Sequence, residues 1–275
     1  EIQRKATKAS CTIAGLNVKR VLNEPTAAAL AFTDAVERRK IAVFDFGGGT
    51  FDISILQVVN GIFEVKATTG NTQLGGDDFD ARLVDWIMNE FKREKGIDLR
   101  EDPVAPQRVR EAAERAKCEL STALETSINL PFIASSDGGP VHLEMSITRG
   151  LFEGLIRDMV ESTRPLCLQV LKDAGLAHED LETVVLVGGS TRIPMVRRLV
   201  EEAFQQEPVH SVNPDEVVAM GAAIAGSVVS GQRKDLVLLD VTSLTMGVET
   251  LGGVMAPIIA KNSPLPIKRS KMFTT

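Results

Sequence analysis

Apolar positions recur along the chain with two different periods, and they predict an alternation of strands and helices. A continuous apolar run over 41–46 predicts a buried strand. Two further strands, 51–59 and 62–69, flank Asn60-Gly61, a dipeptide that favours a type I′ hairpin turn because both central residues take positive φ. The remaining predicted strands cover 18–23, 128–134, 141–147 and 181–187.

Helical spacing of apolar side chains, together with start and stop signals, predicts the helices. Pro165 should break one long helical stretch, and Gly175 should end it. The run Asn213–Glu216 has the pattern of a capping box, so a helix should begin at Pro214. Small residues over 219–226 in that helix allow another backbone to approach closely. The other predicted helices cover 1–14, 26–35, 77–95, 106–125, 151–174 and 195–205.

The pattern changes near the C-terminal end. Residues 234–240 read as a linker that carries an unusual apolar run, Leu236 to Leu239. From Val241 onward, short strands with glycine and proline turns predict the start of a second, β-rich domain. Because the first residue is Glu1 and the first helix is already under way, we expect the chain to be a fragment of a longer protein.

The amino-acid composition argues against several classes of protein. With 31 basic and 37 acidic residues the net charge is −6, and there is one Trp and no Tyr, which disfavours a nucleic-acid surface. The three cysteines are too few and too widely spaced for a disulfide framework or a metal site, and they suit a reducing compartment. The longest apolar stretch, 217–229, is shorter than the roughly 18–20 residues of a membrane span.

The segment Asp45–Asp52 is the first candidate site. Its three glycines, Gly47, Gly48 and Gly49, would bring backbone N–H groups close to an anion at the tip of a hairpin, and Thr50 adds a hydroxyl. Asp45 and Asp52 could hold a divalent ion through its waters, since Mg²⁺ takes few carboxylates. A plain glycine-rich turn is the alternative for the glycines alone, and the flanking acids favour phosphate binding.

The segment Val187–Pro194 is the second candidate site. Gly188 and Gly189 leave bare backbone on which a flat ligand can lie, and Arg192 can stack on a base. Neither segment has the spacing of a Walker loop or of a dinucleotide fingerprint. Two separate glycine loops at strand ends therefore indicate a nucleotide held between elements that are distant in the sequence.

Two weaker patterns remain. Glu114, Lys117 and Ser121 share one face of a predicted helix, which by spacing alone favours a solvated face with one ion pair. Glu24 stands where a strand gives way to a helix, and an ordinary helix cap is the simpler interpretation there. Ser190 has no His–Asp pair of the kind that activates a nucleophile, so it is at most a hydrogen-bonding residue.

Taken together, the motifs resemble the heat-shock protein 70 chaperones of the DnaK type, in order and over essentially the whole chain. Residues 71–73 and 107–122 look closer to the bacterial and organellar branch. The matching segments are NEPTAAA (23–29), DFGGGTFD (45–52), LGGDDFD (74–80), VGGSTRIP (187–194), NPDEVVAMGAA (213–223) and LLDVT (238–242).

The resemblance implies an α/β fold, namely the actin-like (ribonuclease H-like) ATPase domain, of which this chain would be mostly lobe II. It implies a remnant of lobe I, an inner and an outer part of lobe II, an interdomain linker and the first strands of a peptide-binding β-sandwich. These parts would cover 1–34, then 35–74 with 152–231, then 75–151, 232–240 and 241–275, respectively.

The resemblance also implies residue roles around ATP or ADP with Mg²⁺, and K⁺ is compatible. Asp45 and Glu24 would act in the magnesium and water shell, with Asp52 and Thr50 as further catalytic residues. The nucleotide would be bound by Gly47, Gly48, Gly49, Thr50, Gly76, Glu114, Lys117, Ser121, Gly188, Gly189, Ser190, Arg192, Ile193 and Asp215. The linker would be Leu236, Val237, Leu238, Leu239 and Asp240, and peptide would contact Val248, Leu251 and Phe273.

The implied function is ATP-driven binding and release of unfolded polypeptide, helped by a J-domain co-chaperone and a nucleotide exchange factor. No nucleic-acid or membrane partner is expected, and the compartment would be the bacterial cytoplasm, the mitochondrial matrix or a plastid. The family's first phosphate loop and its lysine would lie upstream of Glu1, so we expect this chain alone to be inactive. Small-molecule kinases and actin-like scaffolds share the fold and are the alternatives. A kinase has no reason for a linker that leads into a β-rich segment, and filament formation on adding ATP would favour a scaffold.

The chain departs from the family pattern at several positions. Phe46 stands where Leu is usual, and Cys118 occupies a variable adenine-side position. Ser243, Thr245 and Met246 replace the more usual Pro, Ser and Leu just past the linker, which affects how stiff that segment is expected to be.

Overall fold

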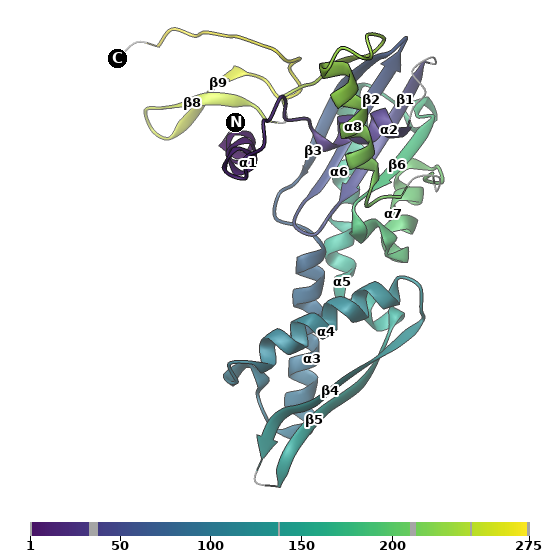
Figure 1. Ribbon diagram of the computed structural model, residues 1–275, viewed down its shortest axis with the longest axis vertical. Helices are drawn as coiled ribbons and strands as arrows, with labels where there is room; N and C mark the ends of the chain where they lie inside the picture. The colour runs from purple at the N-terminus through teal and green to yellow at the C-terminus, as the bar shows by residue number, and fades with distance from the viewer. Residues whose placement is uncertain (1, 33–37, 137, 210–212, 243, 274–275) are drawn as a thin grey trace.

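The computed structural model describes residues 2–32, 38–136, 138–209, 213–242 and 244–273 (Figure 1). Its centre is a mixed five-stranded sheet in the order β6-β1-β2-β3-β7. β1 pairs antiparallel with β2 and parallel with β6, and β3 pairs antiparallel with β2 and parallel with β7. The strands are β1 (Arg39–Phe46), β2 (Phe51–Val59), β3 (Ile62–Asn71), β6 (Thr183–Val187) and β7 (Val237–Leu239).

Most of the predicted helices are present. Pro165 and Gly175 act as predicted: the long helical stretch is divided into two helices, and Gly175 ends the second with a φ of 67°. The helices are α1 (Ile2–Ile13), α2 (Glu24–Phe32), α3 (Gly76–Lys95), α4 (Ala105–Leu120), α5 (Arg149–Glu161), α6 (Arg164–Ala174), α7 (Pro194–Phe204) and α8 (Val217–Val229). Single-turn helices η1 (Leu99–Glu101), η2 (His178–Asp180) and η3 (Gly189–Arg192) complete the set.

One predicted strand and two predicted helix boundaries are wrong. The helix predicted over 106–125 ends at Leu120, where residues 121 and 122 form a turn. Residues 18–23 form no strand, since no described segment pairs with them and extended backbone becomes a strand only beside a partner. Helix α8 begins at Val217 rather than Pro214, because residues 214–216 form a turn. The Asn213 side chain accepts a hydrogen bond from Asp215 N within this turn, so it caps the turn and not α8, whose N-cap is Glu216. Residues 33–35 of the predicted helix 26–35, Asp137 between the predicted strands 128–134 and 141–147, and Ser243 lie outside the described residues.

The first face of the sheet is covered by large side chains. Phe44 and Phe51 lie 4.9 Å apart between ring centroids, and Phe46 packs edge-on against Phe79 of α3 at 5.4 Å. The same apolar cluster runs on through helices α3 to α7. It reaches the hairpin of β4 (Glu125–Ser136) and β5 (Gly139–Thr148), where Ile128, Leu143 and other side chains pack against it. One continuous core therefore joins the sheet to the α3–α4–hairpin region.

The second face is covered by α2 and α8, which cross in front of the sheet in Figure 1. The two helices approach so closely that a Cβ on Gly221 would lie 1.7 Å from the carbonyl oxygen of Ala27. This confirms that the small residues in α8 admit another backbone. The apolar cluster on this face contains Ile41 and Val43 of β1 with Ala28 and Ala29 of α2.

The apolar run 236–239 lies on the sheet edge. Val237 and Leu238 are in register with Ile62 and Phe63, and Val237 N donates to the carbonyl oxygen of Gly61 at 2.9 Å. Leu236 is buried in the second-face cluster, and Leu238 packs against it. The predicted linker is thus docked as an edge strand.

The C-terminal strands β8 (Met246–Thr250) and β9 (Val254–Ile259) form a separate antiparallel hairpin. Figure 1 shows it extending away from the sheet. None of its described residues is fully buried, so it forms two paired strands without a second layer. Among the described residues, no helix has the length and apolar character needed to cross a membrane.

Candidate functional site

Two glycine turns meet at the end of the sheet. The first joins β1 to β2, with Gly47 N donating to the carbonyl oxygen of Thr50, as a hairpin tip should. The second follows β6, where Gly188 has a φ of 86° and a Cβ on it would lie 2.4 Å from the carbonyl oxygen of Phe46. Ser190, from the second turn, donates its hydroxyl to the carbonyl oxygen of Gly47 at 2.9 Å. The two turns predicted from the sequence are therefore in direct contact.

The first turn leaves open space beside its backbone. A Cβ added to Gly47 or Gly49 would meet nothing within 4 Å, and neither residue has a positive φ. Glycine is therefore required here less for the turn itself than for the space it leaves, which a ligand can approach. The turn and the side chain of Thr50 are exposed on this side.

The N-terminus of α3 packs under the same turn. Gly76 N and Asp77 N donate to the carbonyl oxygens of Gly47 and Gly48 at 3.0 and 2.8 Å. A Cβ on Gly75 would lie 2.0 Å from the carbonyl oxygen of Gly48, so only glycine fits there. Asp78 Oδ2 accepts from Gly75 N and so caps the start of the helix.

Three carboxylates lie on the second face of the sheet, beside this turn. Asp45 and Asp52 are directly opposite one another in the β1–β2 register, and Glu24 begins α2. Burial, followed by the charges of Glu24 and Asp52, raises the pKa of Asp45 to about 7. Burial and then the charge of Glu24 raise the pKa of Asp52 to about 6, although a hydrogen bond from Thr50 acts in the opposite direction.

Like charges held together in this way favour a bound cation, because a cation offsets their repulsion. Within the described parts of the chain, no three His, Cys, Asp or Glu side chains are close enough to ligate a metal directly. The donor set therefore fits an ion such as Mg²⁺ that keeps most of its waters and takes few protein oxygens.

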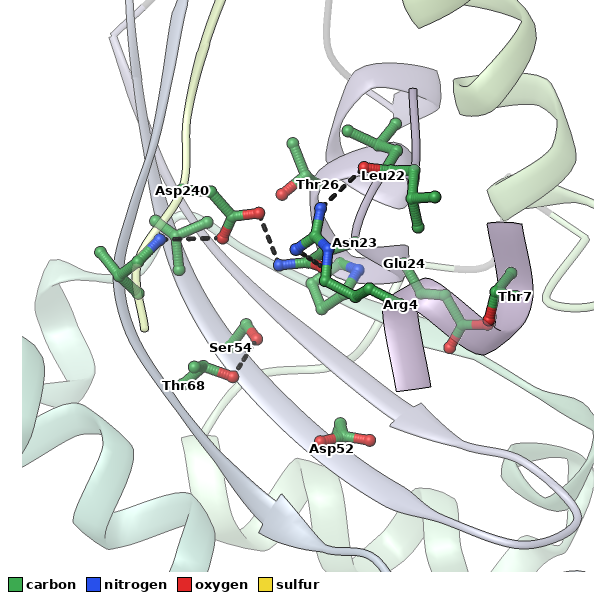
Figure 2. A pocket seen from close by; sticks show the side chains of 14 residues that line it. Arg4, Thr7, Leu22, Asn23, Glu24, Thr26, Asp52, Ser54, Thr68 and Asp240 are labelled. Atoms are coloured by element: carbon green, nitrogen blue, oxygen red, sulfur yellow. Dashed lines mark hydrogen bonds between the residues drawn. The ribbon is translucent and has the colours of Figure 1, made fainter. Parts of the chain in front are cut away.

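A cavity of about 350 Å³ lies behind these carboxylates, and Figure 2 shows the side chains that line it. Glu24 and Asp52 lie at one side of it and Asp240, the residue after β7, at the other. Asn23 Nδ2 donates to Asp240 Oδ2 at 2.5 Å, and Arg4 donates to Asn23 Oδ1 and to the carbonyl oxygen of Val21. One cavity thus extends from Glu24 and Asp52 to Asp240 at the end of β7.

Helix α4 brings its predicted polar residues to the same end of the molecule. Lys117 Nζ lies 3.2 Å from the carbonyl oxygen of Gly76 and 2.6 Å from Asp80 Oδ2. Ser121, one turn further along, donates to the Lys117 carbonyl oxygen at 3.4 Å. Glu114 is exposed on the same helix and lines a surface depression with Cys118.

The second turn carries an exposed ion pair. Arg192 donates to Asp215 Oδ2 at 2.6 Å and to Asn213 Oδ1 at 2.9 Å, and both members of the pair are about half exposed. Asp215 Oδ1 would lie 3.6 Å from a Cβ on Gly189, so this pair stands over the second glycine turn. The Ile193 side chain instead packs in the first-face core.

The structure does not bring every predicted residue to this site. Val248, Leu251 and Phe273 lie on the C-terminal segment, where all three side chains are exposed. Conversely, the sequence analysis did not identify Asp80, Arg4 or Asn23 as site residues. Asp80 lies within the LGGDDFD motif, but no spacing rule links it to Lys117, which is 37 positions further along the chain.

Comparison with known proteins agrees with this geometry. A protein-family model described as Hsp70 protein matches residues 1–275. The chaperone protein DnaK of Thermotoga neapolitana and that of Thermotoga maritima are each 55% identical to this chain over 282 residues. Each alignment covers 100% of the chain and 47% of the relative, so the chain spans about half the length of these curated relatives.

Proposed function

The chain belongs to the Hsp70 family, and from this we propose that it supplies most of one ATPase lobe and the linker of an ATP-dependent chaperone. The whole protein would bind and hydrolyse ATP and use that cycle to bind and release unfolded polypeptide. The observation that carries the proposal is the contact between the two glycine turns, Ser190 Oγ to the Gly47 carbonyl oxygen, beside three clustered carboxylates.

We propose the division of the chain that the resemblance implies. Residues 1–34 would belong to lobe I, 35–74 and 152–231 to the inner part of lobe II, and 75–151 to its outer part. Residues 232–240 would be the linker, and 241–275 the start of the peptide-binding domain. The docked strand β7 supports the linker assignment, and the unlayered β8–β9 hairpin is compatible with an incomplete sandwich.

In this proposal the phosphates lie against Gly47, Gly48, Gly49 and Thr50, where the turn leaves open space. Backbone N–H groups and the Thr50 hydroxyl would donate to phosphate oxygens. The adenosine would lie between α4 and the second turn, against Lys117, Ser121 and Gly189, with Glu114, Gly76, Gly188, Ser190, Arg192, Ile193 and Asp215 around it.

The catalytic role falls to the carboxylates on the second face. Asp45 and Glu24 would hold the water shell of a magnesium ion and orient the attacking water, and Asp52 with Thr50 would support that arrangement. Bound Mg²⁺ supplies charge neutralisation for the transferring phosphoryl group. Since the pKa of Asp45 is raised to about 7, its ionisation would be coupled to the arrival of the cation.

The linker would report the nucleotide state to the peptide-binding domain. Its strand β7 adds to the sheet edge, and its last residue, Asp240, borders the cavity that also contains Glu24 and Asp52. A rearrangement at the carboxylates would therefore reach the linker through Asn23. Release of β7 would expose Leu236 and Leu238, so docking and release can act as two states.

Partners and location follow the family. We propose extended polypeptides as clients, a J-domain co-chaperone and a nucleotide exchange factor as regulators, and K⁺ as a possible second ion. The cytoplasm of a bacterium is the proposed location, as befits a relative of bacterial DnaK proteins, with the mitochondrial matrix or a plastid as alternatives.

The test uses the full-length protein that contains this chain. It should bind ADP in calorimetry and hydrolyse ATP in single-turnover assays, and Asp45→Asn should reduce turnover by about 100-fold because it removes a charge from the metal shell. Unchanged turnover would contradict the role of Asp45. The isolated chain should bind ADP weakly and should not hydrolyse ATP, since the opposing phosphate loop and lysine of the family are not among its residues.

A further inference from the structure

A largely buried ion pair joins α3 to α4 next to the glycine turns. Lys117 Nζ donates to Asp80 Oδ2 at 2.6 Å and to the carbonyl oxygen of Gly76 at 3.2 Å. The Lys117 and Asp80 side chains are 15% and 10% exposed. Among the ion pairs between described residues, no other has both partners so little exposed.

The surroundings leave the lysine little freedom. A Cβ on Gly76 would lie 3.3 Å from Lys117 Nζ and 2.8 Å from Ser190 Oγ. The ammonium therefore lies in the same small junction as the Ser190 hydroxyl, which holds the Gly47 carbonyl oxygen. A lysine side chain has four rotatable bonds, so a fixed acceptor is needed to keep it at one point.

Asp80 supplies that acceptor and also a compensating charge. A buried ammonium is costly unless it is paired and hydrogen-bonded. Once it is paired, the group acts as a hydrogen-bond donor of low net charge, which suits sugar hydroxyls and ring nitrogens better than phosphate oxygens. An unpaired lysine at this place would instead attract the phosphates.

We propose that Asp80 is a positioning residue for nucleotide recognition, which fixes the Lys117 ammonium toward the nucleoside half of the ligand and offsets its charge. This inference rests on the proposed function, because it takes the ligand of the site to be a nucleotide. Two further observations support it. Asp80 Oδ1 is buried without a hydrogen-bond partner among the described residues, which leaves the carboxylate with a free acceptor.

The second observation is electrostatic. Burial raises the pKa of Asp80 even though the hydrogen bond and charge of Lys117 act to lower it, and Glu114 and Asp77 raise it further. Mild acidification will therefore protonate Asp80 sooner than an ordinary aspartate and will loosen its hold on Lys117.

The experiment is a double-mutant cycle in the full-length protein, with ADP affinity measured by calorimetry. Asp80→Asn should weaken ADP binding about tenfold, as expected for loss of a charge-assisted hydrogen bond. Because Asp80 acts through Lys117, adding Asp80→Asn to Lys117→Met should weaken binding no further. The matched control is Asp85→Asn on the same helix, whose carboxylate pairs with Arg100 at 3.0 Å, and it should leave the affinity unchanged.

Competition assays identify the half of the ligand that is affected. Asp80→Asn should weaken the binding of adenosine about tenfold. It should leave the affinity for inorganic pyrophosphate unchanged or slightly higher. Wild-type ADP affinity in Asp80→Asn, or equal losses in the wild-type and Lys117→Met backgrounds, would overturn the inference. A wild-type protein that binds no ADP would instead contradict the proposed function.

A second variant covers the case in which Asp80→Asn does not fold. Asp80→Glu keeps the charge and moves the carboxylate by one methylene, so it should weaken ADP binding only while Lys117 is present. An unchanged affinity, or a loss that persists in the Lys117→Met background, would also overturn the inference.

Discussion

The two faces of the central sheet are built differently. The first face is covered by phenylalanine and long aliphatic side chains that continue into α3 to α7. The second is covered by α2 and α8, which are rich in alanine and glycine, and it carries the carboxylates of the candidate site, while β7 extends the sheet at its edge. Adjacent residues of one strand belong to different faces, as Phe44 and Asp45 show.

The first face contributes mainly to the stability of the fold, and the second face carries the candidate functional site. Large interdigitated side chains make the first face a fixed core, because any change of shape there opens a cavity. On the second face α2 and α8 approach one another through small residues, and the short strand β7 at the sheet edge has half-exposed side chains. Displacing a helix or strand should therefore cost less free energy on this face, which also carries the like-charged carboxylates.

The largest expected effect is on the first face. Phe44→Ala should lower the free energy of unfolding by about 3–5 kcal/mol, since Phe44 is fully buried against Phe51. Phe63→Ala on the second face should lower the free energy of unfolding by less, because the adjacent strand β7 can move to fill part of the space. Urea denaturation of both variants measures the difference. Equal losses of unfolding free energy would contradict the claim that the two faces differ in rigidity.

The next effect concerns the carboxylates and has a defined sign. The pKa of Asp45 rises from 3.8 in the unfolded chain to about 7 in the folded one. The folded state therefore holds a proton that the unfolded state releases, and this contribution to stability is present below pH 4 and lost as the pH rises through 7.

Asp45→Asn cannot ionise and should remove this pH dependence. With a chelator present it should be more stable than the wild type at pH 8 by up to about 4 kcal/mol, which is the linkage value for such a displacement. Thermal unfolding at pH 4, 6 and 8 gives the measurement, with Asp52→Asn as a counterpart of smaller effect. A variant less stable than the wild type at pH 8 would contradict the assigned cause.

Helix α8 offers a matched pair of glycines. Gly221→Ala should destabilise the fold by about 1–3 kcal/mol, because the new methyl would collide with the Ala27 carbonyl oxygen. Gly226→Ala, on the same helix, meets nothing within 4 Å and should stabilise it by about 0.5–1 kcal/mol through higher helix propensity. Denaturation midpoints of the two variants should therefore move in opposite directions.

The smallest effect on stability concerns the linker. Leu238→Asp should change the stability of the folded body by less than about 1 kcal/mol, while β7 leaves the sheet edge because a charge is costly beside the apolar cluster. Hydrogen exchange at Val237 N should become fast. Leu239→Asp, at the more exposed neighbouring position, should leave that exchange slow. In the full-length protein, Leu238→Asp should also uncouple peptide release from ATP binding, and normal ATP-stimulated release would count against the linker assignment.

Local signals in the sequence predicted most elements correctly. Asn60 and Gly61 have φ values of 49° and 79°, as the dipeptide requires, and Pro194 begins α7. The segment 18–23 was wrongly predicted as a strand. Its residues favour an extended backbone, but the composition does not show whether another strand lies beside it. The β-bulge opposite Ile55 and Leu56, which shifts the register of β3, also gives no clear signal in the sequence.

The sequence identified the separate motifs of the candidate site, but not the contacts between residues of different motifs. The glycine turns and Asp45 were recognised from their motifs, since each motif lies within a few residues. The role of Asp80 was missed because its partner Lys117 belongs to another helix. The raised pKa of Asp45 could not be predicted either, since it depends on burial and on Glu24, which the fold brings close.

The sequence by itself determined the strands, the helices, their turns and the family, because these depend on propensities and motifs within short stretches of chain. Only the tertiary structure decided which stretches meet. Ser190 contacts Gly47 across 143 positions, and Asn23 contacts Asp240 across 217. Such contacts form when apolar burial over a whole sheet outweighs the entropy of closing long loops, and that balance is a property of the packed chain rather than of any segment.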